Sequence, residues 1–184
     1  RALVIADLPF GSYESSPEQA LATSIRFFKE AGAMAVKLEG AHLATVEKLT
    51  AAGIPVMGHL GLTPQSLHQL GGYRVQGRED GDAILQAALA LEKAGAFAIV
   101  LELVPAELAA KITAALSIPT IGIGAGVDCD GQVLVWTDLV GLTANPPKLA
   151  KAYRNLRSEI SAAAQEFAAD VRGGTFPGSE NTFN

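Results

Sequence analysis

Residues 31–39 read AGAMAVKLE and residues 94–102 read AGAFAIVLE, one pattern written twice that ends each time on a glutamate. Each copy opens with Ala-Gly, which is typical of a helix end with glycine in the left-handed position just past it. The apolar run that follows is too short for a helix and predicts a buried parallel strand. A carboxylate at the end of such a strand lies at the mouth of the sheet, where α/β folds place their chemistry. We therefore expect an enzyme.

Composition narrows the class of protein. With 184 residues, of which 49% are hydrophobic, the chain predicts one compact unit with a sizeable core. No apolar run approaches the roughly 20 residues of a membrane span, so we expect no membrane association. The single cysteine, Cys129, excludes an internal disulfide framework and a cysteine-based zinc site, which favours the cytoplasm. A net charge of -5 with 14 Lys and Arg argues against nucleic acid as a partner.

Helices and strands are expected to alternate along the chain. Ser16 and Pro17 predict the start of a helix and Gly32 its end. Further helices are expected at about 42–52, 82–94, 106–116 and 148–170. The expected strands are residues 2–6 and about 34–38, 55–60, 97–101, 120–123 and 132–136.

The internal repeat favours a barrel. Glu39 and Glu102 lie 63 positions apart, and Ile54-Pro55 recurs 64 positions later as Ile118-Pro119, so two successive strand-helix units repeat as a pair. Such chains form a (β/α)8 TIM barrel or a doubly wound sheet. Because functional-looking residues end nearly every strand, we favour the barrel, as one domain over 1–184 with a C-terminal tail at 172–184. Six strands leave two units to be supplied from a lost or separate N-terminal segment of about 70 to 90 residues.

Five candidate functional residues lie at expected strand ends: Asp7, Lys37, Glu39, His59 and Glu102. Singly, each has an ordinary structural explanation, such as a capped turn or a solvated charge. Together they suit a partly hydrated Mg²⁺ with room for a bidentate substrate, because carboxylates are hard oxygen ligands. Glu102 is the better candidate base, because the repeat places apolar Val100 where the first copy has Lys37 and so predicts a less polar setting.

Two glycine-rich segments each have two interpretations. Residues 122–126 (GIGAG) follow a strand and could cradle phosphate, although close backbone packing is favoured because the spacing is not a dinucleotide fingerprint. Residues 71–78 (GGYRVQGR) are basic and could form a mobile loop over the site or a simple turn.

Several motifs carry a family resemblance. In order along the chain they are ADLPF (6–10), VKLEG (36–40), GHLGLTPQS (58–66), GGYRVQGR (71–78), GIGAG (122–126) and DGQVLV (130–135). This series resembles the ketopantoate hydroxymethyltransferase family over essentially the whole chain. The family's members carry two further strand-helix units before the ADLPF strand, with a Gly-Asp-Ser motif that is not found in these 184 residues.

The resemblance implies an aldol-type transfer in pantothenate biosynthesis. A hydroxymethyl group passes from 5,10-methylenetetrahydrofolate, the co-substrate, to 3-methyl-2-oxobutanoate, giving 2-dehydropantoate with the help of Mg²⁺. It implies that Asp7 and Glu39 lie in the metal's sphere, that Asp7, Lys37 and His59 belong to the substrate site, and that Glu102 accepts the proton. The partners implied are small-molecule substrates and other copies of the chain, in a homo-oligomer such as a decamer.

Two alternatives remain. One is another Mg²⁺-dependent 2-oxo acid enolate enzyme of the same barrel superfamily. A lyase of the isocitrate type would be expected to show a Lys-Lys-Cys-Gly-His run, and Cys129 does not lie in such a run. The other is a non-catalytic fragment that needs a missing N-terminal segment. Metal-dependent turnover would separate this fragment from the enzyme.

Overall fold

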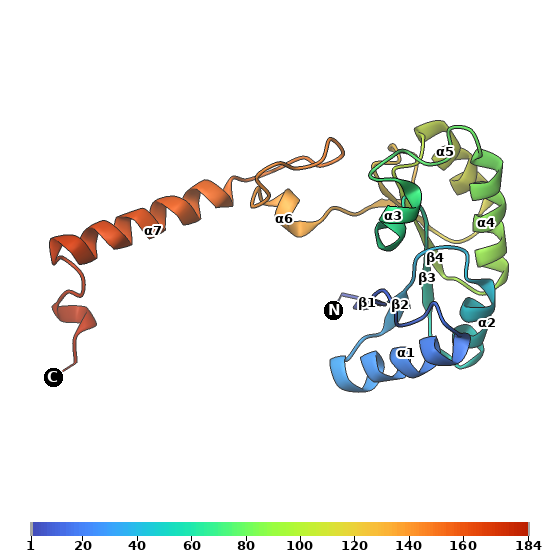
Figure 1. Ribbon diagram of the computed structural model, residues 1–184, viewed down its shortest axis with the longest axis horizontal. Coiled ribbons are helices and arrows are strands. Elements are labelled where there is room, and N and C mark those ends of the chain that lie inside the picture. The colour runs from blue at the N-terminus through green and yellow to red at the C-terminus, as the bar shows by residue number, and fades with distance from the viewer. Residues whose placement is uncertain (1, 184) are drawn as a thin grey trace. The chain divides into compact units, whose positions relative to one another are not determined.

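The computed structural model describes residues 2–183, and its central feature is a six-stranded parallel sheet (Figure 1). The strands are β1 (Ile5–Asp7), β2 (Ala35–Lys37), β3 (Val56–Gly61), β4 (Ala98–Glu102), β5 (Thr120–Ile123) and β6 (Gly131–Gln132). Their order in the sheet is their order in the chain, and each neighbouring pair is parallel. A doubly wound sheet would reverse this order at a switch point, whereas a barrel does not. The expected (β/α)8-type barrel, with six of its strands in this chain, is confirmed.

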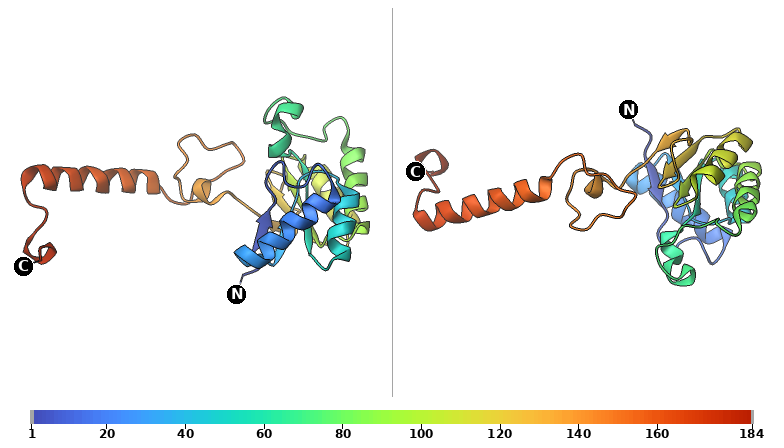
Figure 2. Two further views of the ribbon diagram at one scale, coloured as in Figure 1. Left: turned by 60° about the horizontal axis from the view of Figure 1, so that its bottom comes forward. Right: turned by 90° about the horizontal axis from the view of Figure 1, so that it is seen from above.

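Helices connect the strands from β1 to β5 in turn and cover one face of the sheet (Figures 1 and 2), whereas β5 leads to β6 without a helix. The longer ones are α1 (Pro17–Ala31), α2 (Leu43–Ala51), α4 (Gly81–Lys93) and α5 (Ala106–Ala115), all close to their expected bounds. Between β3 and α4 lie two short elements that the sequence pattern did not indicate, η1 (Pro64–Ser66) and α3 (Leu67–Leu70). Up to β5, the chain therefore crosses over from each strand to the next parallel strand by way of a helix, as is usual in barrels.

The core lies between the sheet and these helices. Alternate residues of a strand point to opposite faces, so one set of strand side chains packs on the helices while the other set is free for a site. The packed strand residues are Val36, Leu38, Val56, Leu60, Ile99 and Leu101, and they share a cluster with Val46, Leu49, Leu91 and Ile112 of the helices. Each such burial contributes roughly 1.5–3 kcal/mol, which holds the strand ends rigidly.

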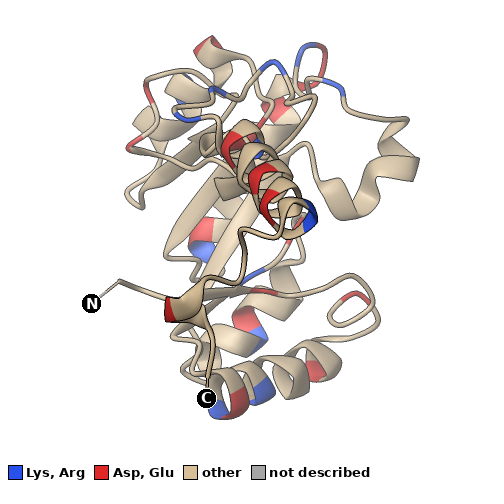
Figure 3. Cartoon of the chain, turned by 90° about the vertical axis from the view of Figure 1, so that its left-hand side faces the viewer, with Lys and Arg blue, Asp and Glu red and all other residues tan. Residues whose placement is uncertain are grey.

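Local sequence explains the bounds of α1. The Ser16 side chain accepts a hydrogen bond from the backbone N–H of Gln19, and Gly32 takes the left-handed conformation that ends the helix. Acidic and basic residues are interspersed in the cartoon of the chain (Figure 3), and in α1 exposed Arg26 pairs with exposed Glu30 at 3.0 Å. Such exposed pairs add little to stability, so capping and the apolar face define this helix.

The chain divides into two compact units, one running to Val133 and the other beginning at Leu134. In the first unit, the opening strand is shorter than expected: β1 starts at Ile5, and Leu3 and Val4 are half exposed. The Val4 carbonyl still accepts hydrogen bonds from Met34 and Ala35, so the chain runs beside β2 before the regular strand begins. The extent of a single domain over 1–184 stays a prediction.

The end of the sheet differs from expectation. A strand over 132–136 was expected, but β6 ends at Gln132 and a short helix, α6 (Trp136–Leu139), begins within the apolar run. The prediction was wrong because Val133, Val135 and Trp136 are exposed side chains in the described structure and not a buried strand. After Val133 donates to the Gly122 carbonyl, the Val135 carbonyl instead accepts the first hydrogen bonds of α6.

The second unit contains the long C-terminal helix α7 (Leu156–Gly173), which begins eight residues later than expected. Its start is fixed by Asn155, whose side chain accepts a hydrogen bond from the Ser158 N–H. Before it, the Tyr153 N–H donates to the Leu139 carbonyl, so this stretch is held by α6 and not by helical bonds. Gly174 ends α7 and η2 (Ser179–Asn181) follows. Among residues 2–183, no helix has both the length and the apolar character to cross a membrane.

Candidate active site

The five sequence-predicted residues meet at the carboxyl ends of β1 to β4. Asp7 pairs in register with Lys37, and Lys37 pairs with Met57, two positions before His59. His59 in turn pairs with Val100, two positions before Glu102. Paired residues of parallel strands, and residues two apart on one strand, point to the same face. The register therefore places these side chains together on the sheet face opposite the packed core.

Four short contacts join the five side chains. Lys37 Nζ lies 2.7 Å from Asp7 Oδ1 and 3.3 Å from His59 Nδ1. On the other side of the imidazole, His59 Nε2 lies 3.3 Å from Glu102 Oε2. Glu39 Oε1 lies 3.9 Å from His59 Nδ1, beyond hydrogen-bond distance. His59 is therefore the centre of the cluster.

The contacts assign the tautomer of His59. A lysine ammonium has only donors, so in the contact with Lys37 the Nδ1 atom must be the acceptor. A neutral imidazole then carries its proton on Nε2, on the side of Glu102. His59 Nε2 has no hydrogen bond of good geometry in the described structure, although Glu102 is within ion-pair distance. The imidazole is thus aimed at the Glu102 carboxylate without being fully engaged by it.

Glu39 is buried, with only 5% of its side chain exposed, and it lies where the parallel pairing continues past β2. The Leu38 N–H donates to the Met57 carbonyl and the Gly40 N–H to the His59 carbonyl, which fixes the backbone on both sides. Burial raises the pKa of Glu39 above its usual value, and the Gln65 N–H, which donates to Oε2 at 2.9 Å, opposes that rise. A nearby cation, Lys37 or a protonated His59, also opposes it.

The expected contrast between the two glutamates, with Glu102 in the less polar setting, stays a prediction. Glu39 is the more buried of the two and has Lys37 nearby, while the Glu102 side chain is 13% exposed and faces His59. The sequence comparison considered only neighbours on the same strand, whereas His59 of β3 lies near both carboxylates. The role of Glu102 as base stays a prediction.

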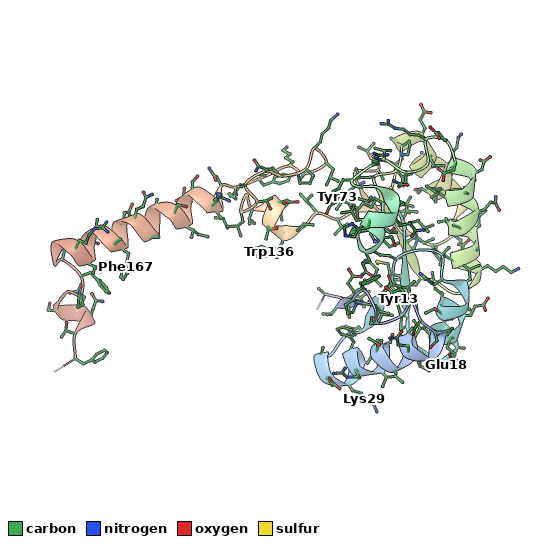
Figure 4. The ribbon with its side chains drawn as sticks, in the orientation of Figure 1. Tyr13, Glu18, Lys29, Tyr73, Trp136 and Phe167 are labelled. Atoms are coloured by element: carbon green, nitrogen blue, oxygen red, sulfur yellow. The ribbon has the colours of Figure 1, made fainter. Side chains whose placement is uncertain are left out.

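Sequence reasoning missed two residues of this region, Tyr13 and Gln65. The Tyr13 hydroxyl donates to Gln65 Oε1 at 2.7 Å and accepts from the Glu39 N–H at 3.3 Å. Desolvation by burial raises the pKa of Tyr13 to about 12. In Figure 4 Tyr13 lies among the dense side chains around the strands, whereas Tyr73 projects from the segment after α3. Gln65 lies inside the GHLGLTPQS motif, so that motif could have indicated it.

The backbone next to Glu102 is unusually constrained. Leu103 has φ 47, the one non-glycine residue with positive φ among residues 2–183, and such conformations concentrate at functional sites. Its N–H donates to the Ile123 carbonyl, and its own carbonyl accepts from the Gln76 N–H at 2.9 Å. The 71–78 segment thus contacts the backbone beside Glu102 directly. Whether it moves over the site stays open.

Asp7 and Glu39 fit a divalent cation by the chemistry of their donors. Lys37 engages Asp7 Oδ1 and the Gln65 N–H engages Glu39 Oε2, which leaves one oxygen of each carboxylate without a hydrogen bond in the described structure. Mg²⁺ is commonly held by one or two carboxylates, with water and substrate oxygens completing its shell. Across residues 2–183, no three His, Cys, Asp or Glu side chains are grouped to hold an ion by themselves. A metal here would therefore need oxygens from water or substrate.

Two other features lie apart from the five-residue cluster. A hollow of about 480 Å³ opens between the starts of α4 and α5, and its lining mixes Arg78 and Lys111 with Asp82 and Glu107. None of the five candidate residues lines it. The 122–126 segment packs closely, since a Cβ at Gly122 would lie 3.0 Å from the Cys129 sulfur. This favours the packing interpretation of its glycines over a phosphate cradle.

The fold and the cluster define a (β/α)-barrel protein with a lysine, an imidazole and three carboxylates at the carboxyl ends of its strands. The family model described as ketopantoate hydroxymethyltransferase matches residues 1–179. The chain belongs to the ketopantoate hydroxymethyltransferase family. A relative from Acidothermus cellulolyticus, named 3-methyl-2-oxobutanoate hydroxymethyltransferase, is 63% identical over 100% of this chain and 69% of its own length. Another of that name, from a Nocardioides species, is 60% identical over 100% of this chain and 63% of its own.

Solved structures agree with the fold. Phosphonopyruvate hydrolase matches with a TM-score of 0.51 and 16% identity, over 98% of this chain and 64% of that one. Phosphoenolpyruvate phosphomutase from Streptomyces platensis subsp. rosaceus matches with a TM-score of 0.50 and 15% identity, over 92% of this chain and 61% of that one. At such identities the likeness shows the fold alone. The chain spans about two thirds of the length of the curated relatives described above.

Proposed function

We propose that the protein transfers a hydroxymethyl group from 5,10-methylenetetrahydrofolate to 3-methyl-2-oxobutanoate, giving 2-dehydropantoate, with Mg²⁺ as its metal. The name borne by its relatives supports the reaction. The observation that carries the proposal in this chain is the line of contacts from Asp7 through Lys37 and His59 to Glu102. This line supports the proposal because it joins a candidate metal ligand, Asp7, to a candidate base, Glu102, through Lys37 and His59.

The reaction needs a proton acceptor near C3 of the keto acid. Water first cleaves both C–N bonds of the donor's methylene group, which gives formaldehyde and tetrahydrofolate, with the two water protons on the freed nitrogens. Glu102 takes the C3 proton, and the electron pair of the C–H bond moves toward the C2 carbonyl and then forms the new bond to the formaldehyde carbon. The alkoxide that results takes the proton back from Glu102. His59, with its Nε2 proton toward Glu102, would donate to the carboxylate and stabilise its charge before the proton arrives.

The keto acid carries negative charge that the site must balance. Lys37 supplies a cation whose side chain is 17% exposed, so solvent ions screen it weakly, and its ammonium would pair with the acid's carboxylate. Asp7 and Glu39 would hold the metal, directly or through water, and a bound divalent cation supplies positive charge to the keto acid's oxygens. His59 would complete the substrate site, and its side chain, 5% exposed, lies near both glutamates.

A direct test uses the full-length protein in two steps. Nuclear magnetic resonance in D₂O should show exchange of the keto acid C3 proton without the folate donor, and mass spectrometry should show 2-dehydropantoate once the donor is added. A chelator should suppress both signals and added Mg²⁺ should restore them. Absence of exchange and of product with Mg²⁺ present would remove the proposal.

We also propose, from the same family membership, a cytoplasmic homo-oligomer with the size of a decamer. Its partners are small-molecule substrates and further copies of the chain, and it binds neither nucleic acid nor a membrane. Sedimentation velocity of the full-length protein should give the mass of ten chains. A single monomeric species at micromolar concentration would contradict it.

A further inference from the structure

Gln65 ties together the chain segments that follow β1 and β2. Its side-chain Nε2 donates to the Leu8 carbonyl at 2.9 Å, just past β1. Its Oε1 accepts from the Tyr13 hydroxyl at 2.7 Å, and its backbone N–H donates to Glu39 Oε2 at 2.9 Å. One residue at the start of η1 therefore fixes its own side chain at two points and presents its N–H to the carboxylate at a third.

Tyr13 completes this network from the other side. Its hydroxyl accepts from the Glu39 N–H and donates to Gln65, so both of its hydrogen-bonding functions are used. Its ring is 2% exposed and meets the edge of the His42 ring at 5.5 Å and 88°. Hydrogen bonds in such a buried setting are strengthened by the low dielectric and hold their members in one arrangement.

The network ends at Glu39 and does not extend to the rest of the cluster. Among the described residues, neither Tyr13 nor the Gln65 side chain has a hydrogen bond to Lys37, His59 or Glu102. Their effect on the site must therefore pass through Glu39. Because Gln65 holds Oε2, the remaining oxygen, Oε1, is the one presented toward the cluster.

We propose that Gln65 and Tyr13 are positioning residues for Glu39, acting as one unit that sets which carboxylate oxygen faces the metal and the keto acid. This inference rests on the proposed function, because it takes Glu39 as a residue of the metal site. It adds two residues from outside the strand ends, and it gives the TPQ part of the GHLGLTPQS motif a physical task.

The test compares Gln65→Met and Tyr13→Phe in the full-length protein. Gln65→Met keeps the length of the side chain and the backbone N–H but loses both side-chain hydrogen bonds, and Tyr13→Phe removes the hydroxyl alone. Each should raise the KM for 3-methyl-2-oxobutanoate and the dissociation constant of Mn²⁺, measured by electron paramagnetic resonance without substrate, by about tenfold. At saturation kcat should change less than threefold, a smaller effect because Glu102 is untouched.

Controls and outcomes separate positioning from folding. Gln86→Met, at an exposed position of α4, and Tyr153→Phe, at an exposed position of the second unit, make the same chemical changes. Both should leave the KM for the keto acid and the dissociation constant of Mn²⁺ as in the wild type. The double variant Tyr13→Phe with Gln65→Met should be no worse than the poorer single variant, because the two act as a unit.

Three results would overturn the inference: unchanged constants in both variants, a fall in kcat and melting temperature with KM unchanged, or fully multiplicative effects in the double variant. Failure of the wild type to bind Mn²⁺ and to exchange the C3 proton would instead count against the proposed function.

Discussion

His59 and Glu102 face each other from neighbouring strands, with His59 Nε2 3.3 Å from Glu102 Oε2. Both side chains are largely shielded from solvent, and the pairing of β3 with β4 runs through Gly61 and Glu102 to the very end of the strands. The contact is close enough for a charge interaction but lacks hydrogen-bond geometry.

The tautomer of His59 gives the first prediction. Because Lys37 occupies Nδ1, nitrogen-15 resonance should show His59 protonated at Nε2 at neutral pH. In Lys37→Met that preference should weaken, since the donor to Nδ1 is gone. Lys29→Met, on the exposed side of α1 (Figure 4), is the matched control and should leave the His59 signals unchanged. Protonation at Nδ1 in the wild type would contradict the assignment.

Replacement of the candidate base gives the second prediction. Glu102→Gln keeps the shape of the side chain but cannot accept the C3 proton. Exchange of that proton with solvent should slow by about 100- to 10,000-fold, the usual scale for a lost general base, with Mn²⁺ affinity nearly unchanged. Glu107→Gln, an exposed change on α5, should exchange at the wild-type rate. Exchange at that same rate in Glu102→Gln would assign the base elsewhere.

Most of the helices and strands could be predicted from the sequence, because the residues that begin and end each element lie within it or next to it. The glycines after α1 and α4, Pro17 in the first turn of α1 and the short apolar runs each act within one element. The strand-end site was also predictable, since parallel strands bring their carboxyl ends to one edge. The prediction failed at residues 132–136, where an apolar composition typical of a strand is exposed in the structure and leads into α6.

The polar network around Glu39 could not be predicted in the same way. Tyr13 and Gln65 are 52 positions apart, and a hydrogen bond between two loop side chains leaves no periodic pattern in the sequence. The same holds for the approach of His59 to both glutamates, which depends on sheet register. What the sequence predicted was the set of residue types at the site, and what it could not predict was which of them touch.

Removing one candidate metal ligand gives the third prediction. Asp7→Asn keeps the size of the side chain but loses the charge that pairs with Lys37 at 2.7 Å and that would hold a divalent cation. The Mg²⁺ concentration for half-maximal activity and the KM for the keto acid should both rise, while the melting temperature stays close to that of the wild type because Asp7 is 55% exposed. An unchanged Mg²⁺ titration would take Asp7 out of the metal site.

The fourth prediction concerns stability and pH. Burial raises the pKa of Glu39 in the folded protein above its ordinary value near 4.5, so the folded state binds this proton more tightly than the unfolded state. The stability that this pKa difference contributes is fully present at pH below the ordinary pKa of a glutamate. It is lost as pH rises through the pKa of Glu39 in the folded protein. Glu39→Gln lacks this loss and can still accept from the Gln65 N–H. Thermal unfolding with a chelator should show the variant gaining on the wild type as pH rises from about 4 to 7. If the melting temperatures of the two proteins changed with pH in parallel, the ionisation of Glu39 would not lower the stability of the folded state.

The last prediction concerns Gly61, which lies opposite Glu102 in the sheet register. Gly61 has φ +90, and a Cβ there would lie 2.2 Å from the Glu102 carbonyl oxygen and 2.6 Å from Val104 Cγ2. The first neighbour is backbone and cannot move without shifting Glu102 itself. Gly61→Ala should therefore lose both stability and C3 proton exchange.

Gly53→Ala is the matched control for this change. It has φ +81 but nothing within 4 Å of the added Cβ, so it carries the backbone strain, about 1–3 kcal/mol, without the clash. Gly61→Ala should be less stable than Gly53→Ala by a further ~1–3 kcal/mol in chemical unfolding, the usual cost of overpacking. Equal losses in the two variants, with proton exchange retained, would show that the ends of β3 and β4 can separate without disturbing Glu102.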